Sequence, residues 1–206
     1  MPAAEYLTAF VTLFVVVDPI GLAPLFVALT SGMSNRERRR MGLRAVTIGA
    51  ILLTLFGLLG DKVLGFIGIS MPAFRIAGGL LLFLTALEML FERRTQRREG
   101  HEPEPSHDPS VFPLATPLIA GPGAMAAMIL LAGAPGADAM HIALIHGVML
   151  AVLACVLGMF MLAGPIERAL GRTGTMVVTR LLGMLLAALA VQFILDGLRG
   201  AGVFGG

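Results

Sequence analysis

Six long apolar stretches, separated by short polar ones, dominate the pattern of this chain. They cover approximately residues 6–29, 41–60, 72–91, 111–132, 142–164 and 176–198. A helix rises about 1.5 Å per residue and a bilayer core is about 30 Å thick, so about 20 apolar residues can cross it. The pattern therefore predicts an all-α membrane protein with six transmembrane helices.

The longest polar segment divides these helices into two groups of three. Residues 93–110 are rich in Arg, Glu and Pro, a composition typical of a disordered connector. We therefore expect a three-helix repeat over residues 1–92, a cytoplasmic polar linker over 93–110, and a second three-helix repeat over 111–206. His101, His107 and Asp108 have metal-binding side chains, but they lie in this linker without a rigid scaffold, so we predict no metal site.

The two groups carry matching landmarks at a nearly constant spacing. Pro19 and Pro122, each inside the first apolar stretch of its group, are 103 residues apart. Arg75 and Arg180, each followed by a glycine three positions later, are 105 residues apart. Because each group has an odd number of spans, two copies must lie in the membrane in opposite orientations. The spacing predicts two inverted three-helix repeats, and interrupted helices at matching positions of such repeats are typical of transporter binding sites.

Helices 1 and 4 are expected to be broken at mid-membrane. Asp18 lies about 12 residues into the first stretch, about 18 Å deep and close to the midplane. Asp is a preferred N-cap residue and Pro a preferred first residue of a helix, so a second half-helix is predicted to begin at Pro19. The stretch Gly121-Pro122-Gly123 interrupts the fourth helix at a similar depth. Alternatively, Asp18 only caps a kinked helix and contacts no ligand.

The residues at the two predicted breaks favour a small zwitterionic ligand. Half-helix N-termini offer free N–H groups and positive dipole ends to a carboxylate. Asp18 favours an ammonium group or a coupling cation, since a carboxylate in a membrane normally faces a cavity or a partner. A small neutral amino acid satisfies both features and the limited space beside the glycines. The predicted substrate-binding residues are Asp18, Pro19, Gly21, Gly121, Pro122 and Gly123.

Arg75 and Arg180 are candidates for a supporting role at this site. In that role, they would bond the C-terminal carbonyl groups of the broken helices as a symmetric pair. The alternative is that both side chains extend to the membrane interface, as long cationic side chains do.

Composition excludes the soluble classes of protein. The chain is 57% hydrophobic and 14% charged, with a mean hydropathy of +0.89, far from soluble averages. Its one cysteine, Cys155, rules out an internal disulfide and a cysteine-based metal cluster. No metalloprotease, Ser-Lys or paired-carboxylate pattern is visible, so we predict no enzyme activity and no cofactor.

The expected partners are the lipid bilayer and a small-molecule substrate, without nucleic acid. The coupling ion, H⁺ or Na⁺, is left open by the sequence, and a homo-oligomer is compatible with it.

Basic residues predict the orientation of the chain in the membrane. Only Lys62 and Arg199 lie in the loops on one side of the predicted helices. Because loops rich in Lys and Arg stay in the cytoplasm, both termini are predicted to face the periplasm. Ten basic residues lie in the loops on the other side, namely Arg36, Arg38, Arg39, Arg40, Arg93, Arg94, Arg97, Arg98, Arg168 and Arg172.

Several of these stretches resemble signatures of the MarC family of bacterial inner-membrane proteins. Asp18-Pro19-Ile20-Gly21, followed by Pro24 and Phe26, resembles its first signature. Pro113, Pro117 and Gly121-Pro122-Gly123-Ala124 resemble its second. The resemblance covers nearly the whole chain outside the polar linker. It implies a multi-pass inner-membrane protein grouped with the LysE-type exporters, and a relative is regarded as a small neutral amino acid transporter.

One departure from the family pattern concerns the residues after the second signature. Many relatives have hydroxyl residues there, whereas this chain has Met125-Ala126-Ala127-Met128, which leaves fewer polar contacts for a substrate. We therefore predict an inner-membrane secondary transporter of small neutral amino acids or similar zwitterions, with its site between helices 1 and 4. The alternative is a non-transporting membrane scaffold or assembly protein, in which the broken helices serve only packing.

Overall fold

All regular structure is helical in the computed structural model, which describes residues 3–30, 32–91, 108–134 and 136–203. Within these ranges, five helices are long and apolar enough to cross a membrane. A sixth span results when the bent pair Ser110–Ile119 and Pro122–Ala132 is counted as one. The prediction of an all-α, multi-pass membrane protein is therefore confirmed.

Eight helical elements follow one another along the described chain, and one of them, η1, is irregular. In order they are α1 (Ala3–Val17), α2 (Pro19–Leu29), α3 (Asn35–Ile67), α4 (Met71–Leu90), η1 (Ser110–Ile119), α6 (Pro122–Ala132), α7 (Ala139–Met161) and α8 (Ala163–Gly200).

The helix α3 is longer than the predicted stretch of residues 41–60. Ser34 and Glu37 form a capping box, in which the Ser34 hydroxyl accepts from the Glu37 N–H (3.4 Å) and the Glu37 carboxylate accepts from the Ser34 N–H (2.8 Å). The four arginines expected in the first loop therefore lie in the first turns of α3. Lys62, expected in the second loop, also lies within α3, which ends at the left-handed Gly68 (φ 84°).

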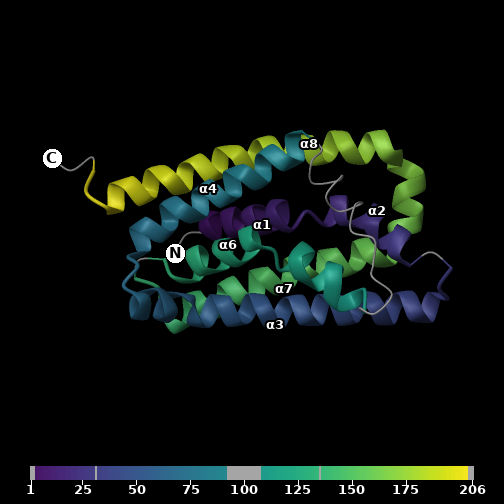
Figure 1. The fold of residues 1–206 in the computed structure, drawn as a ribbon, viewed down its shortest axis with the longest axis horizontal. Helices are drawn as coiled ribbons and strands as arrows, with labels where there is room; N and C mark the ends of the chain where they lie inside the picture. Colours follow the sequence, from purple (N-terminus) through teal and green to yellow (C-terminus); the bar gives the residue numbers. More distant parts are fainter. Residues whose placement is uncertain (1–2, 31, 92–107, 135, 204–206) are drawn as a thin grey trace.

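The two interrupted segments form the centre of the molecule. Figure 1 shows α1, α2 and α6 between the pair α4 and α8 on one side and the pair α3 and α7 on the other. In the most apolar 18-residue part of the span Ala4–Leu29, 56% of the residues are buried. The corresponding share is 22–28% in the four unbroken spans. The first span thus supplies much of the protein core, whereas the surrounding helices turn large parts of their surfaces outward.

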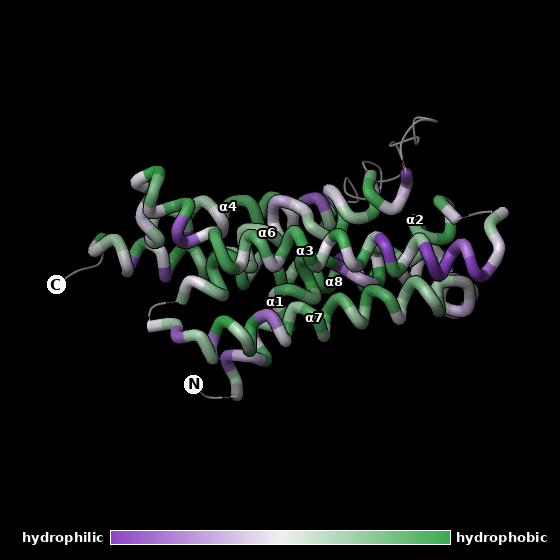
Figure 2. Tube along the Cα trace, turned by 90° about the horizontal axis from the view of Figure 1, so that it is seen from below, coloured by the Kyte–Doolittle hydropathy of each residue, from purple (hydrophilic) through white to green (hydrophobic). Residues whose placement is uncertain are grey.

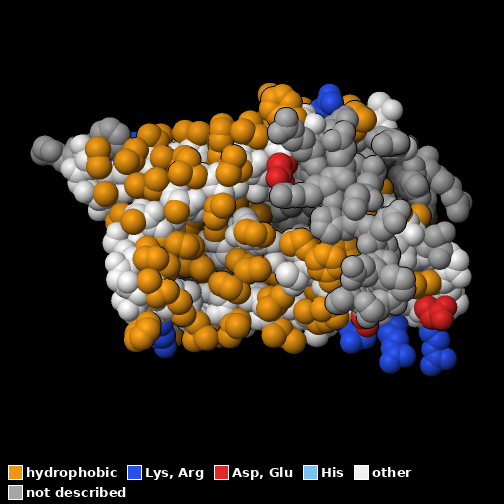
Figure 3. Space-filling view, in the orientation of Figure 1, with side chains coloured by type: hydrophobic (Ala, Val, Ile, Leu, Met, Phe, Trp, Pro, Cys, Tyr) orange, Lys and Arg blue, Asp and Glu red, His pale blue; other side chains and the backbone are white. Residues whose placement is uncertain are grey.

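Apolar side chains cover these outer surfaces. Exposed examples are Leu55 on α3, Leu84 on α4, Leu150 on α7 and Met184 on α8. Figure 3 shows this apolar cover, with Lys and Arg side chains gathered near the start of α3. Figure 2 places that hydrophilic start at the end of the molecule opposite both chain termini. An apolar surface of this extent is typical of proteins surrounded by lipid.

The helices α4 and α8 pack antiparallel with their backbones close together. A Cβ atom placed on Gly79 would lie 2.9 Å from the Ala190 carbonyl oxygen, and one placed on Gly183 would lie 3.2 Å from that of Ala86. Glycine at these two positions permits the close contact, as small residues do between helices in membranes. The helix α8 turns sharply at Gly171, so residues Thr173–Gly200 form the span beside α4 (Figure 1).

A polar cluster at Asp108 precedes η1. The Asp108 carboxylate accepts hydrogen bonds from the Ser110 hydroxyl (2.7 Å) and backbone N–H (2.9 Å), and it pairs with Arg44 on α3. The bonds from Ser110, aided by Arg44, hold the pKa of Asp108 below its usual value. The cluster therefore ties the start of η1 to α3.

Candidate functional site

The first helix break is at Asp18, between α1 and α2. This residue is fully buried and adopts the left-handed conformation (φ 57°, ψ 64°). Its Oδ1 atom accepts a hydrogen bond from the Gly21 N–H (3.0 Å), so Asp18 caps α2, and Pro19 is the first residue of that helix. A left-handed conformation is uncommon for residues with a side chain, but Asp tolerates it.

The Asp18 carboxylate explains the glycine at position 21. A Cβ atom on Gly21 would lie 2.7 Å from the Asp18 Cγ atom and would overlap Oδ2. The carboxylate thus occupies the space beside the first turn of α2 that a side chain would otherwise fill.

The second helix break lies between η1 and α6, whose axes are bent by 53°. Within η1, Phe112 and Thr116 have extended backbone dihedrals, and each precedes a proline, which disfavours a helical conformation. Gly121 then caps α6 with an extended backbone, and Pro122 is the first residue of the helix. A Cβ atom on Gly121 would lie 2.5 Å from the Pro117 carbonyl oxygen, so the bend requires glycine there.

The two breaks lie close together in the core. A Cβ atom on Gly123, in the first turn of α6, would lie 3.4 Å from side-chain atoms of Val16 on α1 and of Leu82 and Thr85 on α4. Val16 is two residues before Asp18, so the positive N-terminal end of α6 is in the same region of the core as the buried carboxylate. Substrate binding by the residues at these breaks stays a prediction.

The two arginines lie apart from each other. Arg180 is exposed on α8, whereas Arg75 is half-buried in the first turns of α4. Arg75 lines a pocket of about 360 Å³ that also contains residues from the first turns of α1, near the N-terminus.

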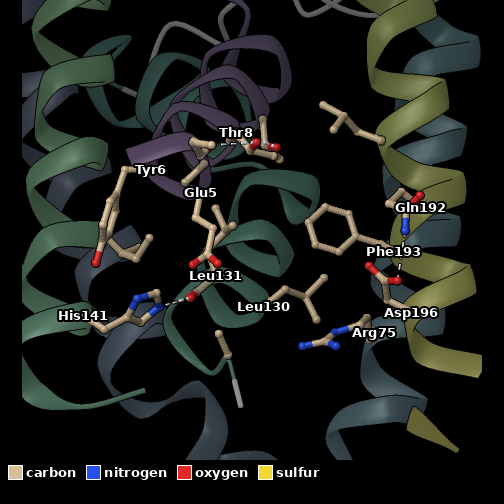
Figure 4. A pocket seen from close by; sticks show the side chains of 16 residues that line it. Glu5, Tyr6, Thr8, Arg75, Leu130, Leu131, His141, Gln192, Phe193 and Asp196 are labelled. Carbon is tan, nitrogen blue, oxygen red and sulfur yellow. Dashed lines mark hydrogen bonds between the residues drawn. The ribbon is translucent and has the colours of Figure 1, made fainter. Parts of the chain in front are cut away.

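This pocket combines charged, polar and apolar side chains from five helices. Figure 4 shows the Arg75 guanidinium and the Glu5 carboxylate directed into this pocket. Its other polar residues are Tyr6, Thr8, Thr12, His141, Gln192 and Asp196. Leu130, Leu131, Ile145, Leu189 and Phe193 form most of the apolar wall.

His141 is part of the wall of this pocket. It is buried (7% exposed), its Nε2 atom lies 2.8 Å from the Leu131 carbonyl oxygen, and its Nδ1 atom has no hydrogen-bond partner among the described residues. A carbonyl oxygen can only accept, so Nε2 carries the proton and Nδ1 is left as a buried acceptor. The neighbouring Tyr6 ring packs on the imidazole at a centroid distance of 6.1 Å.

Sequence reasoning did not predict this pocket. Glu5, His141 and Asp196 lie near the ends of apolar stretches, where polar side chains are usually solvated. Nothing in their spacing indicates that α1, α7 and α8 bring them together. Two local signals point toward it: Arg75, which was predicted to support the helix breaks and lines this pocket instead, and Gln192, an amide within an apolar stretch.

The linker predictions fall mostly outside the described residues. Residues 93–107 are not described, and they include His101 and His107 together with Arg93, Arg94, Arg97 and Arg98. Asp108 is described and belongs to the polar cluster with Ser110. In the described ranges, no group of three or more His, Cys, Asp or Glu side chains could hold a metal ion.

The chain matches known proteins over nearly its full length. A UPF0056 membrane protein of Archaeoglobus fulgidus is 37% identical over 205 residues, which cover 96% of each chain. UPF0056 membrane protein YhcE of Escherichia coli is 36% identical, over 95% of this chain and 92% of the relative. UPF0056 membrane protein YvbG of Bacillus subtilis is 33% identical, over 93% and 92%. No solved structure matches the chain significantly. Residues 3–202 match the MarC family of integral membrane proteins, and the chain belongs to that family.

Proposed function

We propose that this protein is a secondary transporter of small neutral amino acids, or similar small zwitterions, in the bacterial inner membrane. The observation that carries the proposal is the buried Asp18 carboxylate at a helix break, beside a second break at residues 121–123. Ionisable groups inside membrane spans are costly and mark substrate or ion pathways. Asp18 would interact with the substrate ammonium group or the coupling ion, H⁺ or Na⁺, and the N-terminus of α6 with the carboxylate.

Paired contacts between α4 and α8 support the inverted repeat on which this proposal rests. Adding 104 to Gly79 and Ala86 gives Gly183 and Ala190. The contact between Gly79 and Ala190 then becomes the contact between Gly183 and Ala86, and both contacts occur. An antiparallel helix pair whose contacts exchange in this way is what a two-fold axis between the repeats would produce.

The same offset relates α3 and α7. A Cβ atom on Gly42 would lie 3.4 Å from Met161, and one on Gly57 would lie 2.9 Å from His146. Adding 104 to Gly42 and Gly57 gives positions 146 and 161, so these two contacts also exchange. Two independent helix pairs therefore support one and the same relation between the halves.

Local backbone features agree with this offset. Gly32 and Gly136, 104 residues apart, are both left-handed (φ 78° and 76°), and the N-caps Ser34 and Asp138 follow each of them by two residues. At this offset, Arg75 corresponds to position 179, so Arg75 and Arg180 differ by one helical position rather than being strict counterparts.

Both termini are proposed to face the periplasm. The first residues of α1 and the last of α8 lie at one end of the molecule, and the arginine-rich start of α3 lies at the other (Figure 1). Because basic residues stay in the cytoplasm, alkaline phosphatase fused after Gly206 should be active, since it folds only in the periplasm. A C-terminal fusion partner that is active only in the cytoplasm would contradict this orientation.

Flux measured in proteoliposomes tests the proposed transport directly. We expect saturable movement of labelled glycine, L-alanine or L-serine above that of protein-free liposomes, dependent on an imposed H⁺ or Na⁺ gradient. Competition by the other unlabelled small neutral amino acids should reduce it. If the whole panel shows no flux in either direction under either gradient, the scaffold alternative is favoured.

A further inference from the structure

We infer that the pocket between α1, α4, α6, α7 and α8 is an outer binding site for amino-acid zwitterions. In this site Arg75 binds the substrate carboxylate and Glu5 binds the ammonium group. The inference rests on the proposed function and extends it, because this site is separate from the helix breaks and none of the six residues predicted there lines it.

Arg75 is the first part of the argument. Its side chain is half-buried at the start of a membrane span, and it has no hydrogen bond or ion pair with any residue in the described ranges. Figure 4 shows its guanidinium group directed into the pocket. The planar guanidinium group suits a carboxylate, to which it can donate two parallel hydrogen bonds. A partly desolvated arginine without a protein partner therefore favours an anionic group of a ligand.

Glu5 supplies the opposite charge across the same pocket. It is also without a hydrogen bond or ion pair among the described residues, and Figure 4 shows its carboxylate directed into the space. The other acid, Asp196, already accepts hydrogen bonds from Gln192 (2.9 Å) and Arg199 (3.2 Å). Glu5 is thus the acid available to a ligand, and it does not pair with Arg75. Two opposite charges that line one cavity but do not pair match a ligand that carries both.

The remaining walls indicate the rest of the ligand. The cavity of about 360 Å³ lies in the range of small-molecule sites, about 300–1,000 Å³. Leu130, Leu189 and Phe193 line the same pocket with apolar side chains. We therefore expect amino acids with a short apolar side chain, such as L-valine, to bind better than polar amino acids of similar size.

The test compares L-valine with two analogues that each lack one of its charges. These are 3-methylbutanoate, without the ammonium group, and 2-methylpropylamine, without the carboxylate. Binding is measured by calorimetry on the purified full-length protein. Arg75→Gln should weaken binding of L-valine and 3-methylbutanoate about ten-fold or more and leave 2-methylpropylamine unchanged. Glu5→Gln should weaken L-valine and 2-methylpropylamine and leave 3-methylbutanoate unchanged.

Lys62→Gln is the matched control. Lys62 is an exposed cation near the C-terminal end of α3, and it lies outside the pocket. It should bind all three compounds like the wild type. An undiminished affinity of Arg75→Gln for L-valine would overturn the inference. So would a wild type that does not bind L-valine, or an equal loss for all three compounds in variants that melt like the wild type, since such a loss would not depend on the charge that was removed.

The outer site and the proposed transport can fail separately. Charge-selective binding without flux in proteoliposomes would support the outer site and contradict the transporter. If the flux of L-valine depends on its concentration in the same way in Arg75→Gln and in the wild type, the outer site is contradicted and the transporter still stands.

Discussion

Replacing Asp18 with Asn is expected to weaken substrate or ion binding ten- to hundred-fold while the protein stays folded in the membrane. Asn caps helices about as well as Asp and also tolerates the left-handed conformation, so the hydrogen bond from the Gly21 N–H is retained. The negative charge is removed, and one carboxylate oxygen is replaced by an amide NH₂ group. A buried charge-assisted hydrogen bond contributes about 1.5–3 kcal/mol, which corresponds to roughly that change in affinity.

The control for this experiment is another capping aspartate. Asp138 caps α7 by accepting from the His141 N–H (2.7 Å), and it is exposed and outside both candidate sites. Asp138→Asn should transport like the wild type. Transport is measured on purified variants whose melting temperatures match the wild type. Unchanged transport in Asp18→Asn would reduce Asp18 to the cap of a kinked helix.

Gly121→Ala is expected to cause the largest loss of stability among single-methyl additions at the helix breaks. The new Cβ atom would lie 2.5 Å from the Pro117 carbonyl oxygen, which is a backbone atom and cannot rotate away. The bend between η1 and α6 would have to open, and overpacking of this kind costs about 1–3 kcal/mol. Because the first turn of α6 lies against Val16 and Thr85, the shift should also reduce transport.

Gly147→Ala on α7 is the matched control, since nothing lies within 4 Å of a Cβ atom placed there. It should be neutral or stabilising by up to about 1 kcal/mol, because alanine favours a helix more than glycine does. Thermal unfolding of both variants in the same detergent provides the comparison. Equal melting temperatures for Gly121→Ala and the wild type would show that the bend adapts without cost.

The sequence predicts those parts of the fold that depend on neighbouring residues. The start of α2 follows from the capping preference of Asp18 and the fixed backbone of Pro19, both of which act within one turn. The extent of α3 was predicted wrongly, because a polar cluster of arginines resembles a loop. The capping box of Ser34 and Glu37 nevertheless starts the helix before the cluster.

The pocket lined by Glu5 and Arg75 could not be predicted from neighbouring residues in the sequence. Glu5 and Arg75 are 70 residues apart and belong to different helices. Their common position depends on how α1 packs among α4, α7 and α8, and no local preference specifies that packing. The contact between Gly123 and Val16 is likewise a tertiary one, although the repeat in the sequence indicates which two segments to compare.

The sharp turn at Gly171 determines how well α8 matches the thickness of a bilayer. The whole of α8 has 38 residues, and as a straight rod it would be about 57 Å long, nearly twice the hydrocarbon thickness of about 30 Å. Hydrophobic mismatch of that size would force the helix to tilt steeply or the bilayer to deform. Gly171 has a combination of φ 59° and ψ 179° that is open essentially only to glycine. One residue without a side chain therefore limits the membrane-crossing part of α8 to Thr173–Gly200, about 42 Å long, which matches the about 40–45 Å of a bilayer with its headgroup regions.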